Sequence, residues 1–134
     1  ERSYRMLKID AKTLFESFTA LQELATQKIS GNAKLAYNLG KTLKCVKTEI
    51  EQLQTQEIAI FKEFGGVEVP GGGVKIPEDS LTPERQEEFN KARKDLLAVE
   101  VELWGNEITL EELEKAKVEL SAGQCAALSW LLKE

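Results

Sequence analysis

The sequence predicts a mainly helical α+β fold. We expect a long antiparallel helical hairpin (about 10–29 and 33–64), a small two- or three-stranded sheet and short C-terminal helices. Apolar residues recur every three or four positions from 33 to 64, with one interruption at Glu57, as on one face of a helix. The break at 30–32 is so short that long helices on either side of it must run antiparallel. From 97 to 104, aliphatic residues at every second position alternate with a set that includes Glu100 and Glu102, which is typical of a half-buried strand.

The chain is expected to begin with a short strand at 7–9, followed by the first helix. Asp10 is a suitable N-cap for a helix from Ala11 to about Ile29. Gly31 can adopt the left-handed conformation that ends a helix, and Asn32 can cap the next one. Met6 has the form of a natural start, and the sequence leaves open whether residues 1–5 are native or an upstream extension.

The second helix, from 33 to 64, would be about 48 Å long at 1.5 Å per residue. The first helix is too short to cover it, so the part from Leu53 to Phe64 needs either the C-terminal half of this chain or another subunit. The apolar stripe fits a core inside one domain or a coiled-coil-like seam between copies, and we expect a homo-oligomer that associates through Leu53, Ile60 and Phe64. The stripe comprises Ala36, Leu39, Leu43, Val46, Ile50, Leu53, Ile60 and Phe64.

Glycines at 65 and 66 are expected to end this helix, and a β-hairpin should follow at 67–77 around the glycines at 71–73. These glycines could also suggest a phosphate-binding loop. However, such a loop requires a helix directly after it, and Pro77 follows instead. The Thr82-Pro83 pair should start a third helix, which runs to about Asp95.

Strand is the favoured interpretation of 97–104, with continued helix as the alternative, and a turn at Gly105-Asn106 should follow. Two capping boxes then predict short helices. Thr109 with Glu112 opens one that ends near 118, and Ser121 with Gln124 opens a final one through 132. We expect a single domain, 1–134, with a helical-hairpin subregion (9–64) and a mixed subregion (65–134).

Composition narrows the possible functions. The net charge of -5 makes nucleic acid an unexpected partner for the chain as a whole. No apolar run approaches the roughly 20 residues needed to span a bilayer, and no signal peptide is apparent. Cys45 and Cys125 lack a CxxC motif, which fits buried thiols in a reducing, cytoplasmic compartment. Histidine, the commonest general base and metal ligand, is absent, so we expect no enzyme, no metal site and no cofactor.

Lysines gather at the start of the second helix, near the hairpin tip. We predict a site for an anionic ligand or a partner protein there, formed by Lys28, Lys34, Tyr37, Asn38 and Lys41. Lysines in a first helical turn oppose the helix dipole, and a bound anion would relieve that conflict. The alternative is a solvated face that complements glutamates on a neighbouring helix.

Carboxylate pairs offer a weaker signal. Glu100 and Glu102 lie two positions apart, which puts both on one strand face. A metal site there is disfavoured, since the chain has no histidine and no Asp/Asn-rich loop to complete it.

Several short patterns together resemble small phage-encoded helical-hairpin proteins of unknown function. They are Met6-Leu-Lys-Ile-Asp, Ala36-Tyr37, Glu49-x-Glu51 and the ending Leu120-Ser-Ala-Gly-Gln-x-x-Ala-Leu-x-Trp-Leu-Leu. The resemblance implies a bacterial host cytoplasm and carries no catalytic residue. It suggests an interaction protein that inhibits or sequesters a host component, as in counter-defence, or a scaffolding component of virion assembly.

Overall fold

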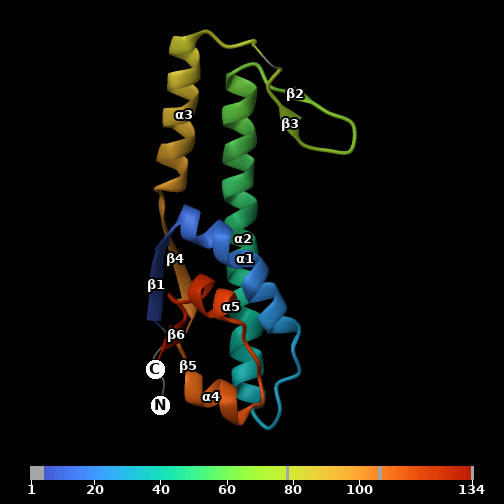
Figure 1. The fold of residues 1–134 in the computed structure, drawn as a ribbon, viewed down its shortest axis with the longest axis vertical. Coiled ribbons are helices and arrows are strands. Elements are labelled where there is room, and N and C mark those ends of the chain that lie inside the picture. Colours follow the sequence, from blue (N-terminus) through green and yellow to red (C-terminus); the bar gives the residue numbers. More distant parts are fainter. Residues whose placement is uncertain (1–4, 78, 106, 134) are drawn as a thin grey trace.

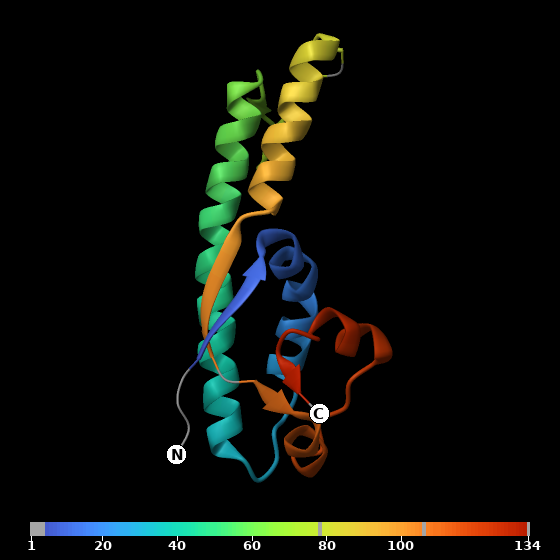
Figure 2. The ribbon, with the colours of Figure 1, turned by 90° about the vertical axis from the view of Figure 1, so that its left-hand side faces the viewer.

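The computed structural model describes residues 5–77, 79–105 and 107–133, and it confirms a mainly helical α+β fold. The long helix α2 runs the length of the molecule, and the other elements lie along it (Figures 1 and 2). Residues 1–4, most of the possible upstream extension, lie outside the described part. Asn106, in the expected turn at Gly105-Asn106, also lies outside it. The elements are β1 (Arg5–Asp10), α1 (Ala11–Thr26), α2 (Ala33–Glu63), β2 (Val67–Glu68), β3 (Val74–Lys75), α3 (Pro83–Leu97), β4 (Glu100–Gly105), β5 (Ile108–Thr109), α4 (Leu110–Lys115), α5 (Ala122–Ala127) and β6 (Leu132–Lys133).

The strand expected at 7–9 is the central part of β1, and it pairs antiparallel with β4. Leu7 lies opposite Leu103 and Ile9 opposite Val101, which places apolar side chains on the same face. The strand expected at 97–104 is confirmed but begins at Glu100, because α3 continues to Leu97. The result is a two-stranded sheet against α2, with Val101 and Leu103 buried.

The caps of the helical hairpin are those that the sequence indicates. Asp10 accepts a hydrogen bond from the Thr13 amide (2.7 Å), and Asn32 accepts one from the Leu35 amide (3.0 Å). The expected end of α1 at Ile29 is wrong, since the helix stops at Thr26. Gln27 instead leaves the helix and exchanges side-chain hydrogen bonds with the Glu119 backbone (2.6 and 3.1 Å), which draws the chain toward the C-terminal segment.

One core occupies the half of α2 that follows the hairpin tip. The expected stripe is shifted there, because Leu35 and Thr42 are buried whereas Ala36 is exposed and Leu43 only half-buried. The cause is that α2 is contacted by both α1 and β4, which widens its buried face beyond a coiled-coil seam. The largest fully buried apolar side chains are Leu14, Leu21, Leu24, Leu39, Val46, Leu103, Leu128 and Leu131.

The far half of α2 is covered by α3, which lies beside it in both ribbon views (Figures 1 and 2). Phe89 of α3 is 8% exposed and packs against the rings of Phe61 and Phe64, with centroids 5.3 and 5.4 Å away. The Arg85 guanidinium lies 4.2 Å from the centre of the Phe64 ring. These aromatics lie outside the main core cluster. We call the assembly of 54–63, the β2–β3 hairpin and α3 the arm.

The C-terminal segment folds back on the chain. Both capping boxes are present, at Thr109 and Ser121. The expected final helix through 132 is wrong: α5 ends at Ala127, and β6 pairs parallel with β5. The Leu131 carbonyl accepts a hydrogen bond from the Ile108 amide (2.8 Å), a long-range bond that a continuing helix would not make. None of the described helices has both the length and the apolar character needed to cross a membrane.

Candidate binding groove

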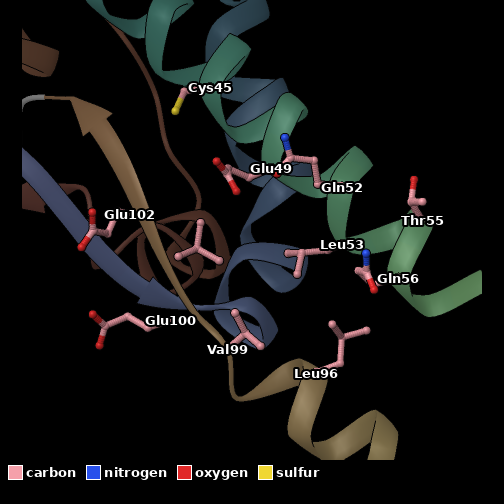
Figure 3. A pocket seen from close by; sticks show the side chains of 11 residues that line it. Cys45, Glu49, Gln52, Leu53, Thr55, Gln56, Leu96, Val99, Glu100 and Glu102 are labelled. Carbon is pink, nitrogen blue, oxygen red and sulfur yellow. The ribbon is translucent and has the colours of Figure 1, made fainter. Parts of the chain in front are cut away.

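An open groove of about 900 Å³ lies between α2 and the β4 edge, at the junction of the main core and the arm (Figure 3). Its size falls in the range of ligand-binding clefts. One wall is the face of α2 that turns toward the sheet, and the other is the end of α3 with β4. The lining residues are Cys45, Glu49, Gln52, Leu53, Thr55, Gln56, Leu96, Val99, Glu100, Val101 and Glu102.

The β4 edge that faces this groove has no strand beside it. Among the described residues, β4 pairs only with β1. The Val99 carbonyl accepts from the Ala11 amide (2.8 Å), which continues the β1–β4 register by one position. Because bonding alternates in an antiparallel ladder, Val101 and Leu103 bond toward β1, and the N–H and C=O groups of Glu100 and Glu102 point the other way. The groove therefore has a row of backbone donors and acceptors available to a bound chain.

The rim of the groove is acidic. Glu49 points from α2 toward β4, whereas Glu100 and Glu102 stand off β4 toward the neighbouring strand β1 (Figure 3). Lys8 of β1 lies 3.8 Å from the Glu100 carboxylate and 3.9 Å from that of Glu102. One lysine thus serves two carboxylates, and with Glu49 the rim has a net negative charge.

The floor of the groove is apolar. Leu53 points from α2 toward β4 (Figure 3), and Leu96 of α3 lies half-buried beside it. Val99, in the link between α3 and β4, is 45% exposed and is among the few large apolar residues exposed in the described chain. The free thiol of Cys45 is half-buried at the other end. The groove thus combines an apolar floor, polar walls and a free strand edge.

The basic face expected at the start of α2 is present. It lies nearer the hairpin tip than the groove, whose lining begins one turn later at Cys45. Lys34, Tyr37, Asn38 and Lys41 share one helix face by their spacing of three and four. Tyr37 is 65% exposed, and the Lys41 ammonium lies 5.6 Å from its ring centre. Lys28 is exposed in the loop before α2, outside the helix that carries the other four residues.

The residues expected to join copies of the chain occupy different positions. Leu53 lines the groove and is 7% exposed, and Phe64 is buried against Phe89 within one chain. Ile60 is half-buried. Leu53 and Phe64 therefore have partners without a second copy, so a seam through them gains no support. Association of copies stays a prediction, and it would have to use another face.

The groove is the site that the sequence analysis missed. Glu100 and Glu102 were considered only as metal ligands, and no group of three metal-binding side chains occurs among the described residues. A signal was available on α2, where Glu49, Gln52 and Gln56 form a polar stripe at helical spacing. However, the sequence does not indicate that this stripe faces β4, about fifty positions later.

Comparison with known proteins finds no matching family model, no matching curated protein and no matching solved structure.

Proposed function

We propose that this chain is a non-enzymatic interaction protein that binds a partner protein in the groove between α2 and β4. The observation that carries the proposal is the free edge of β4, which faces an open groove with an apolar floor. An unpaired strand edge is a template for another chain, and the apolar floor gives that chain surface to bury.

The resemblance to phage-encoded proteins suggests the setting. In this proposal the partner is a host component in the bacterial cytoplasm, which the chain inhibits or sequesters as a counter-defence factor. The long α2 helix supports this role physically, because it joins the main core to the arm and holds the groove between them (Figure 1). A preformed groove lowers the entropy lost on binding.

A second candidate surface is the basic face of α2, which would bind a small anionic ligand. The specific observation in its favour is Tyr37, since an exposed aromatic ring with a lysine above it is a common feature of binding surfaces. Lys34, Asn38 and Lys41 would supply the charge and hydrogen bonds. The two surfaces can be tested separately because different stretches of α2 carry them. The basic face ends at Lys41, and the groove lining begins at Cys45.

The main proposal is tested by site-specific photo-crosslinking in the cells that produce the protein. A photo-reactive amino acid is placed at Gln52, which lines the groove, or at Gln54, which is exposed on the same helix outside the groove lining. A third position, Tyr37, reports on the basic face. We expect one protein to be captured from Gln52 and not from Gln54.

The captured protein is then purified and titrated against the wild-type chain and two matched variants. E49Q removes a carboxylate from the groove rim, and E51Q removes one from the same helix outside the groove lining. Weaker binding by E49Q alone supports the proposal. Capture from Gln52 and Gln54 alike, or only from Tyr37, would contradict the groove as the binding site.

A further inference from the structure

We propose that the groove binds an extended, basic segment of its partner, which adds as a third strand to the free edge of β4. This inference rests on the proposed function and names the chemistry of the partner. The segment would alternate basic and apolar residues.

The backbone of β4 sets the extended conformation. The N–H and C=O groups of Glu100 and Glu102 face the groove, so a strand beside β4 can exchange hydrogen bonds with both residues. A helix in the groove would satisfy its backbone internally and leave these groups to water. Strand addition therefore uses a feature that other binding modes leave unused.

The carboxylates of Glu100 and Glu102 favour basic residues on the outer face of the added strand. Side chains directly opposite each other on paired strands lie about 5 Å apart at their Cβ atoms. On the β1 side, Lys8 already lies opposite Glu102 and near Glu100. A lysine or arginine opposite Glu102 on the new strand would mirror Lys8 and give the second carboxylate a partner of its own. Glu49 adds negative charge from the α2 wall.

The inner face of the added strand calls for apolar residues. Successive side chains on a strand point to opposite faces, so the neighbours of each basic residue would point toward the groove floor. That floor is formed by Leu53, Leu96 and Val101. Val99, which is 45% exposed, would be covered by the end of the segment. A Lys-Val alternation satisfies both faces.

A second copy of this chain fits the edge less well. If two β4 strands paired about a twofold axis at residue 102, the two Glu102 side chains would lie directly opposite each other. Like charges in that position destabilise the pair, and no lysine of β4 is available to compensate. The observations therefore favour a basic partner over self-association.

The test uses synthetic peptides with capped termini. The probe is Lys-Val-Lys-Val-Lys, and the matched control is Glu-Val-Glu-Val-Glu. Binding is followed by NMR of the isotope-labelled full chain, with hydrogen exchange at the Glu100 and Glu102 amides as the readout. We expect saturating Lys peptide to slow exchange at these two amides by about tenfold or more, and the Glu peptide to leave it unchanged.

Backbone pairing and charge are then tested independently. Two peptides are N-methylated at alternate residues, one at the residues whose N–H groups would point toward β4 and one at the residues whose N–H groups would point away. The first should not bind, and the second should bind normally. The variant E49Q/E102Q should bind the Lys peptide about three- to tenfold more weakly, as expected for the loss of two partly exposed ion pairs. The double variant E51Q/E87Q changes two exposed carboxylates outside the groove lining and should bind it normally.

Each other outcome overturns the inference. The inference is wrong if the Lys and Glu peptides bind equally, or if the Lys peptide binds without slowing exchange at the two amides. It is also wrong if both N-methylated peptides bind, or if the Lys peptide does not bind. Concentration-dependent protection of the same amides without peptide would show that a second copy occupies the edge. If crosslinking from Gln52 captures a partner while the Lys peptide fails, the groove remains the binding site and only the strand mode is wrong.

Discussion

Gly66 lies where the end of α2 turns into the β2–β3 hairpin, and the backbone there leaves no room for a side chain. A Cβ atom at this position would lie 2.6 Å from the Phe61 carbonyl oxygen and 2.7 Å from a methyl group of Val74. The Gly66 amide also donates to the Phe61 carbonyl at 2.7 Å. Gly40, inside α2, is the opposite case, because nothing lies within 4 Å of a Cβ atom built there.

These two glycines give a matched prediction. Gly66→Ala should destabilise the fold by about 1 to 3 kcal/mol, since the added methyl overpacks a fixed turn. Gly40→Ala should stabilise it by about 1 kcal/mol, since alanine loses less backbone entropy in a helix. Urea denaturation of both variants measures the change in the free energy of unfolding. A stable Gly66→Ala protein would show that the hairpin can move away from α2 at little cost.

At the scale of elements, the start of α1 depends on one exposed carboxylate. Hydrogen bonds from the Thr13 side chain and then from the Thr13 amide lower the pKa of Asp10. A carboxyl whose pKa is lowered by folding adds stability above its unfolded pKa, about 3.9, and that stability disappears as the pH falls through the folded pKa. The contribution of Asp10 to the stability of α1 should therefore depend on pH.

The variant Asp10→Asn tests this dependence, because asparagine also caps helices but does not titrate. We expect wild type to be more stable than D10N near pH 6 and the difference to shrink as the pH falls below about 4, the ordinary pKa of an aspartate. Urea denaturation across this range gives the difference directly. Glu51→Gln, an exposed carboxylate of α2, controls for the general loss of one negative charge. A wild-type advantage that stays constant with pH would exclude this role for Asp10.

Features encoded by adjacent residues could be predicted from the sequence, and features encoded by distant contacts could not. The caps at Asp10, Asn32 and Thr82 each follow from a residue and the amide three positions later. The early end of α1 depends on hydrogen bonds between Gln27 and Glu119, which are 92 positions apart. The final strand β6 likewise depends on β5, and the local pattern after Ser121 favours helix.

At the scale of the whole molecule, the same distinction explains why the groove was missed. One wall comes from α2, in the predicted subregion 9–64, and the other from the α3–β4 segment, in the predicted subregion 65–134. The expectation that α2 would be covered by either the C-terminal half or another subunit is resolved for its far half, where α3 is the cover. The basic face could be predicted because it lies within one helix. The groove depends on how that helix meets a strand.

The molecule has two packing centres, the main core and the aromatic cluster of the arm, and they should lose their structure separately. Phe89 is the one buried residue of α3 among those described, so we expect it to contribute most of the apolar packing of this helix against α2. Replacing a buried phenylalanine such as Phe89 with alanine typically lowers the free energy of unfolding by about 3 to 5 kcal/mol. Leu131 is fully buried in the main core, where truncation to alanine costs about 2 to 5 kcal/mol.

We therefore predict different patterns of amide hydrogen exchange in the two variants. Phe89→Ala should speed exchange through α3 by about tenfold or more and leave the β1–β4 amides protected, because the main core does not include Phe89. Leu131→Ala should speed exchange in β1, β4 and the first half of α2, because these elements share its core. Lys91→Ala, exposed on α3, is the control for substitution in that helix. If Phe89→Ala deprotects β1 and β4 as strongly as α3, the molecule unfolds as one cooperative unit, and the groove opens and closes with the entire fold instead of with the arm.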